Sequence, residues 1–128
     1  MKRVLVVDDE PELTAVVREY LQDRYDVTVV HTGTAALEAV RRERPDVVFC
    51  DINMPGPSGV EVLKTLRRTD PTLPVIMVTV STEVAVVQEC LQQGAFAYVP
   101  KPFDLKYVEH MAALATQPGR GAAGSTPA

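Results

Sequence analysis

Five short runs of apolar, mostly β-branched residues recur along the chain. They are residues 4–7, 27–30, 47–49, 75–78 and 96–99. Apart from Thr28, the residues within these runs are apolar in succession rather than alternating with polar ones, which is typical of strands covered on both faces. We therefore expect five strands that are buried between other elements.

Amphipathic segments with helical spacing separate and follow these runs. In the first, apolar residues from Leu13 to Leu21 lie on one helix face, and Pro11 suits the first turn. Asp104 is a candidate N-cap of the last segment, and Gly94 a candidate C-terminal cap of the fourth. The segments are residues 13–21, 36–40, 62–66, 84–91 and 105–112.

Strands that alternate with helices over short connections form parallel βαβ units with right-handed crossovers. We predict an α/β fold, with a doubly wound, flavodoxin-like, five-stranded parallel sheet in the order 2-1-3-4-5 and five flanking helices. In such sheets, ligands bind outside the carboxyl ends of the strands.

Composition narrows the class of protein. The chain has 128 residues, enough for one domain, with 46% hydrophobic residues and a net charge of -4. Its basic residues form no dense cluster, so we expect no nucleic-acid binding. No apolar stretch is long enough for a membrane span and no secretory signal is present, which predicts a cytoplasmic protein. Cys50 and Cys90 are expected to be buried thiols.

The composition changes near the end of the chain. Residues 117–128 contain three Gly, two Pro and no aromatic residue. We therefore expect a folded domain over residues 1–116, followed by a flexible tail or truncated linker over residues 117–128.

Acids, a threonine or a lysine stand at the carboxyl ends of four predicted strands, whereas the second strand ends in a histidine and a threonine, with no acid. Asp8 and Asp9 follow the first strand, Asp51 the third, Thr79 the fourth and Lys101 the fifth. In the predicted strand order these ends share one rim, so we expect the five side chains to converge.

Three carboxylates in one place repel each other unless a cation or protons neutralise them. An all-oxygen ligand set favours a hard ion such as Mg²⁺ over zinc. Acids, a hydroxyl and a lysine together suit phosphoryl transfer, in which a carboxylate can act as nucleophile. Asp51 is the candidate attacking residue, and Asp8 and Asp9 are the candidate metal ligands.

Four segments resemble motifs of the receiver domains of two-component response regulators. The segments are VLVVDDE (residues 4–10), DINMPGPSG (residues 51–59), VIMVT (residues 75–79) and YVPKPF (residues 98–103). The resemblance extends from about Lys2 to Thr116. It implies that Asp51 is the phosphoacceptor, that Asp8 and Asp9 hold Mg²⁺ with Asp51, and that Asn53 offers its backbone carbonyl to the ion.

The resemblance also assigns a switch. Thr79 and Lys101 would each bond a phosphoryl oxygen, with a cis peptide bond joining Lys101 to Pro102, and Tyr98 would turn inward after phosphorylation. The surface formed by the fourth helix, fifth strand and fifth helix would then change, for homodimerisation or contact with a partner. The resemblance implies a sensor histidine kinase or phosphotransfer protein as donor, and an output domain or effector outside this chain. Such a protein is a switch that catalyses only its own phosphorylation and dephosphorylation, not an enzyme with a separate substrate.

One position departs from the family. Val80 follows Thr79, where the family more often has alanine or glycine. We expect this branched side chain to narrow access to Asp51.

Other functions fit the residues less well. A flavin phosphate would meet Asp8 and Asp9 and be repelled, the glycine-rich loops of nucleotide-binding proteins are absent, and Asn53 stands where an aspartyl-phosphate phosphatase would need a second acid. The alternative that stays open is a receiver-like interaction module that acts without phosphorylation.

Overall fold

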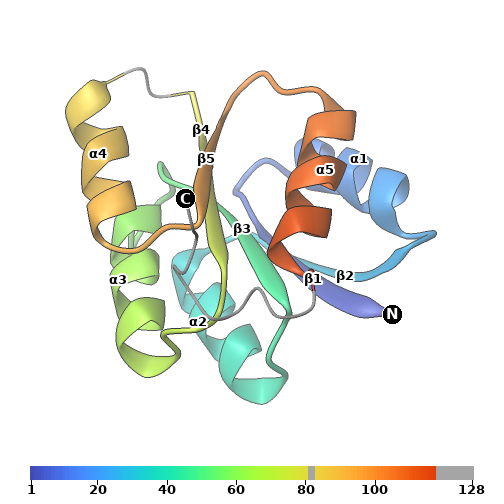
Figure 1. The fold of residues 1–128 in the computed structure, drawn as a ribbon, viewed down its shortest axis with the longest axis horizontal. Coiled ribbons are helices and arrows are strands. Elements are labelled where there is room, and N and C mark those ends of the chain that lie inside the picture. Colours follow the sequence, from blue (N-terminus) through green and yellow to red (C-terminus); the bar gives the residue numbers. More distant parts are fainter. Residues whose placement is uncertain (81–82, 118–128) are drawn as a thin grey trace.

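A computed structural model describes residues 1–80 and 83–117. Five strands and five helices alternate along them (Figure 1). The strands are β1 (Lys2–Val7), β2 (Tyr25–Val30), β3 (Val47–Asp51), β4 (Val75–Thr79) and β5 (Ala97–Pro100). The helices are α1 (Pro11–Leu21), α2 (Gly33–Arg42), α3 (Gly59–Thr69), α4 (Val84–Gln92) and α5 (Leu105–Ala115).

The strands form one parallel sheet in the order β2-β1-β3-β4-β5, as predicted. β3 and β4 are buried throughout, and so are the last four residues of β1. The expectation that every strand is covered on both faces is wrong for the edge strands: β2 has no buried residue and β5 has only Val99. An edge strand has a neighbour on one side only, so its side chains are less enclosed even when they are apolar.

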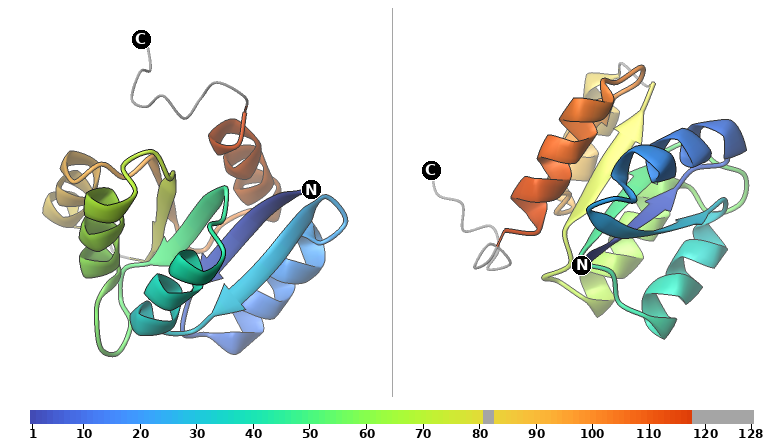
Figure 2. Two further views of the ribbon diagram at one scale, coloured as in Figure 1. Left: turned by 90° about the horizontal axis from the view of Figure 1, so that it is seen from below. Right: turned by 90° about the vertical axis from the view of Figure 1, so that its right-hand side faces the viewer.

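Helices cover both faces of the sheet, which separates the interior into two cores (Figure 2). On one face, α1 and α5 pack against alternate residues of β1, β3 and β4, among them Val6, Phe49 and Ile76. On the other face, α2, α3 and α4 pack against the intervening residues, such as Val7 and Met77. Successive side chains of a strand point to opposite faces, so each central strand contributes to both cores.

The residues predicted at helix ends, Pro11, Asp104 and Gly94, are confirmed. Pro11 is in the first turn of α1, and the Asp104 carboxylate accepts a hydrogen bond from Lys106 N at 2.8 Å at the start of α5. Gly94 follows α4 with a φ of 99°, the left-handed conformation that favours glycine. Ser58 and Glu61 also form a reciprocal capping box at the start of α3.

Gly59 places α3 directly against the end of β3. A Cβ atom there would lie 2.7 Å from Ile52 Cα, and Gly59 N donates a hydrogen bond to the Ile52 carbonyl at 2.8 Å. Only a residue without a side chain allows this approach. The close contact fixes the loop that leaves Asp51.

The predicted tail lies outside the described residues, apart from Gln117. Cys50 and Cys90 are both buried and unpaired, as expected. Among the described residues, none of the helices combines the length and apolar character that crossing a membrane requires.

Candidate functional site

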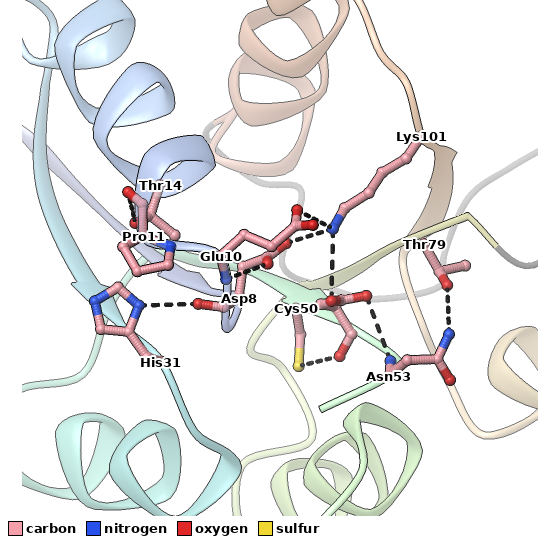
Figure 3. A network of polar contacts seen from close by, with 10 residues as sticks. Asp8, Glu10, Pro11, Thr14, His31, Cys50, Asn53, Thr79 and Lys101 are labelled. Atoms are coloured by element: carbon pink, nitrogen blue, oxygen red, sulfur yellow. Dashed lines mark hydrogen bonds and ion pairs between the residues drawn. The ribbon is translucent and has the colours of Figure 1, made fainter. Parts of the chain in front are cut away.

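The carboxyl ends of β1, β4 and β5 bring Asp8, Thr79 and Lys101 to one rim (Figure 3). Lys101, which follows β5, reaches across the sheet to residues 93 and 50 positions earlier in the chain. Its Nζ lies 2.7 Å from Asp8 Oδ2 and 3.5 Å from Asp51 Oδ2. The predicted convergence of these three side chains is therefore confirmed.

Three carboxylates form the acidic part of the rim. Oxygen atoms of Asp8, Asp9 and Asp51 all lie within 4.8 Å of one another. Asp8 and Asp51 are buried, with 4% and 6% of their surface exposed, whereas Asp9 is exposed. This group offers only oxygen donors at a spacing that one ion can bridge, so it could hold a metal ion, and its chemistry fits a hard cation such as Mg²⁺.

Asn53 connects the acidic group to Thr79. Its backbone N–H donates a hydrogen bond to Asp51 Oδ1 at 3.4 Å, and its side-chain Nδ2 donates to Thr79 Oγ1 at 3.4 Å. Thr79 is fully buried at the end of β4. The predicted role of the Asn53 carbonyl as a metal ligand stays a prediction.

Burial and the charges of the rim shift the pKa values of Asp51 and Lys101. Burial raises the pKa of the Asp51 carboxyl above its ordinary value and the neighbouring Asp8 charge raises it further, against a smaller opposite effect of Lys101. Burial lowers the pKa of the Lys101 ammonium, but the hydrogen bond to Asp8 and the charges of the surrounding acids raise it to a net value above the ordinary one. Lys101 is therefore charged at neutral pH, and an ionised Asp51 is held there at a cost in free energy.

Two neighbours of the site were not predicted from the sequence. Glu10 Oε1 lies 3.4 Å from Lys101 Nζ, which gives this ammonium a third carboxylate. His31, just beyond the edge strand β2, has its Nδ1 3.0 Å from the Asp8 backbone carbonyl; because a carbonyl only accepts, Nδ1 is the protonated nitrogen. Glu10 belongs to the acidic run that begins at Asp8, which was the only signal in the sequence for its position.

The remaining predicted residues lie beside the rim. The peptide bond between Lys101 and Pro102 is cis, as expected. Val80 is 63% exposed directly after Thr79, and Tyr98 is half-buried on β5, opposite Met77 of β4. The predicted switching of Tyr98 and the effect of Val80 on access stay predictions.

Comparison with known proteins identifies the class to which this fold and site belong. Residues 4–113 match the family model of the response regulator receiver domain. The chain therefore belongs to the receiver domains of two-component response regulators, and the resemblance of its motifs is confirmed.

Individual relatives agree with this assignment. The DNA-binding response regulator MtrA of Mycolicibacterium smegmatis is 41% identical over 106 residues, which are 82% of this chain and 46% of that protein. The probable transcriptional regulatory protein TcrX of Mycobacterium tuberculosis is 42% identical over 106 residues, which are 82% of this chain and 45% of that protein. The chain thus spans less than half the length of these curated relatives.

Solved structures show the same architecture. The Vibrio cholerae chemotaxis protein CheY4 is 32% identical, with a TM-score of 0.82 over 88% of this chain and 96% of that one. The Francisella response regulator 1452 receiver domain is 26% identical, with a TM-score of 0.85 over 91% of this chain and 97% of that one.

Proposed function

We propose that Asp51 accepts a phosphoryl group from a phosphohistidine of a sensor histidine kinase or phosphotransfer protein, in a step that requires Mg²⁺. The observation that carries this proposal is the position of the Lys101 ammonium, 3.5 Å from Asp51 Oδ2 within a group of three carboxylates. This combination provides a nucleophile, oxygen ligands for a cation and a fixed positive charge within one rim. Phosphoryl transfer needs these three elements together.

Each side chain of the rim has its own role in the proposed phosphoryl transfer. An Asp51 carboxylate oxygen attacks phosphorus, and the phosphorus–nitrogen bond of the donor breaks with its electron pair staying on that ring nitrogen. The other ring nitrogen of the donor carries a proton, so the histidine side chain leaves as neutral imidazole. Lys101 and the Thr79 hydroxyl stabilise the charge on the phosphoryl oxygens. Asp8, Asp9, Asp51 and the Asn53 carbonyl would hold Mg²⁺, which when bound supplies further positive charge to those oxygens.

The protein acts in this proposal as a switch, without turning over a separate substrate. A bond from Thr79 to the phosphoryl oxygen draws this hydroxyl towards Asp51, and Tyr98 on the neighbouring strand then packs inward. The surface of α4, β5 and α5 changes as a result. This surface would serve a second copy of the chain, or an output domain or effector.

The test is phosphorylation by a small acyl phosphate, followed by intact-mass spectrometry. We expect the wild-type protein to gain the mass of one phosphoryl group with Mg²⁺ and none in chelator. Asp51→Asn should gain none under either condition, while Asp23→Asn, which changes an exposed aspartate, should behave as wild type. Labelling that persists in Asp51→Asn would refute the assignment of the acceptor. A wild-type protein that is never labelled, even by histidine kinases, would instead indicate an interaction module without phosphorylation.

A further inference from the structure

The Lys101 ammonium contacts three carboxylates, more than its proposed role of binding one phosphoryl oxygen explains. Its Nζ contacts Asp8 Oδ2 at 2.7 Å, Glu10 Oε1 at 3.4 Å and Asp51 Oδ2 at 3.5 Å. Asp8 and Asp51 belong to the group of oxygen atoms that could hold a cation, and Glu10 does not. Glu10 therefore contacts the lysine without being one of the candidate metal ligands.

Both carboxylate oxygens of Asp8 already accept hydrogen bonds. Oδ1 accepts from the Glu10 backbone N–H at 3.0 Å, and Oδ2 accepts from Lys101. Asp8 can hold a dication only by sharing its carboxylate with this ammonium, and the two positive charges repel each other. An alternative partner for Lys101 reduces this conflict.

Glu10 is placed to be that partner. It occupies the N-cap position of α1, yet its side chain makes no cap hydrogen bond and contacts Lys101 instead. Its backbone is held by the bond to Asp8, whereas its side chain is 62% exposed. The Glu10 carboxylate can therefore hold the ammonium at the margin of the site when a cation occupies Asp8, while the backbone of the site stays fixed.

We propose that Glu10 is a positioning residue that takes over the Lys101 ammonium when Asp8 binds a divalent cation. This inference rests on the proposed function, because it concerns the Mg²⁺ affinity of the same site. Glu10 strengthens cation binding without ligating the ion, and it keeps Lys101 beside Asp51 for the incoming phosphoryl group.

The experiment measures Mg²⁺ affinity by NMR titration of backbone amide shifts, without any phosphodonor. We expect Glu10→Gln to weaken binding about threefold to fivefold, the range of a partly exposed ion pair. Glu12→Gln is the matched control: it removes an exposed acid of the first turn of α1 and should change the affinity less than about 1.5-fold. An effect of Glu10→Gln no larger than that of Glu12→Gln would overturn the inference.

A double-mutant cycle with Lys101→Met tests whether Glu10 acts through the lysine. In the Lys101→Met background, Glu10→Gln should have no more effect than Glu12→Gln. An undiminished effect in that background would show instead that Glu10 acts on the ion directly, and the inference would be wrong.

A second measurement requires no change at Lys101. In the Mg²⁺-bound wild type, the Lys101 ammonium should give an NMR signal protected from solvent exchange, and Glu10→Gln should lose this protection. Equal protection in both proteins would contradict the inference. If no protein of the series binds Mg²⁺, the proposed function fails as well, whereas Mg²⁺ binding that is independent of Glu10 overturns only the role of Glu10.

Discussion

Replacing Asp51 with asparagine should make the protein more stable in the absence of divalent cations. Burial and the neighbouring Asp8 charge raise the pKa of Asp51, so its ionised form is held beside two other carboxylates at a cost in free energy. Asparagine has nearly the same shape and carries no charge. Asp51→Asn therefore removes the repulsion and the cost of burying the charge, together with the attraction to Lys101.

The magnitude follows from the distances. Asp8 and Asp51 oxygens within 4.8 Å repel by at least about 3.5 kcal/mol at an effective dielectric constant of ~20. Lys101 at 3.5 Å attracts Asp51 by about 4.7 kcal/mol on the same basis. The exposed Asp9 adds about 1 kcal/mol of repulsion, so the charge interactions nearly cancel. The cost of desolvating the carboxylate then determines whether the substitution stabilises the protein. We expect Asp51→Asn to raise the free energy of unfolding by about 1–2 kcal/mol.

The assay is urea unfolding in chelator, with Asp23→Asn as the control for a change at an exposed aspartate. Because the pKa of Asp51 is higher in the folded than in the unfolded protein, the folded state binds the proton more tightly. The difference in the free energy of unfolding between Asp51→Asn and wild type should therefore shrink as the pH falls from the pKa of Asp51 in the folded protein to its ordinary pKa in the unfolded chain. Added Mg²⁺ should also reduce this stability difference, because the wild type has one more carboxylate to bind the ion and is therefore stabilised more by it. An Asp51→Asn variant less stable than wild type in chelator would refute this account of the charges.

Three other substitutions test separate parts of the structure. Gly59→Ala should destabilise the protein by about 3 kcal/mol in urea unfolding, because the added methyl group would meet the Ile52 backbone; a loss below 0.5 kcal/mol, on the order of a surface change, would contradict the close contact. Val80→Ala should speed labelling of Asp51 by a small phosphodonor, measured by mass spectrometry over time, and equal rates would show that the 63% exposed valine does not restrict access. Tyr98→Ala should leave labelling intact and weaken the change at α4 in NMR spectra; an unchanged response would remove its switch role.

The course of the fold could be predicted from the sequence because apolar runs and helical spacing are local patterns. Among the strand boundaries, the beginnings of β1 and β2 differ from the prediction. β1 starts at Lys2 and β2 at Tyr25, each two residues before its apolar run. Backbone pairing places Lys2 opposite Tyr25 and Arg3 opposite Asp26, and polar side chains at an exposed sheet end do not prevent that pairing. Hydrophobic patterns report burial, so they miss strand residues that only the backbone holds.

The site was predictable to the extent that it depends on strand ends. Asp8, Asp51, Thr79 and Lys101 are placed by the strand order, which the alternation of elements already indicates. The contact of Glu10 with Lys101 depends instead on how a long side chain bends across the rim. Such a contact has no periodic signal, and only coordinates show which of several neighbouring acids reaches the lysine.

The burial of the central strands explains how such a repulsive site persists. Asp8 and Asp51 extend from β1 and β3, which pair directly and are enclosed by helices on both faces. Moving the two carboxylates apart would separate these strands and expose the core, at a greater cost than the repulsion itself. The backbone of the site therefore cannot move to relieve the repulsion. When the charge of the site changes, the side chains beside the carboxylates move instead. The side chains beside these carboxylates are those of Glu10, Lys101 and Thr79. We therefore expect cation binding and phosphorylation to change the positions of these three side chains first.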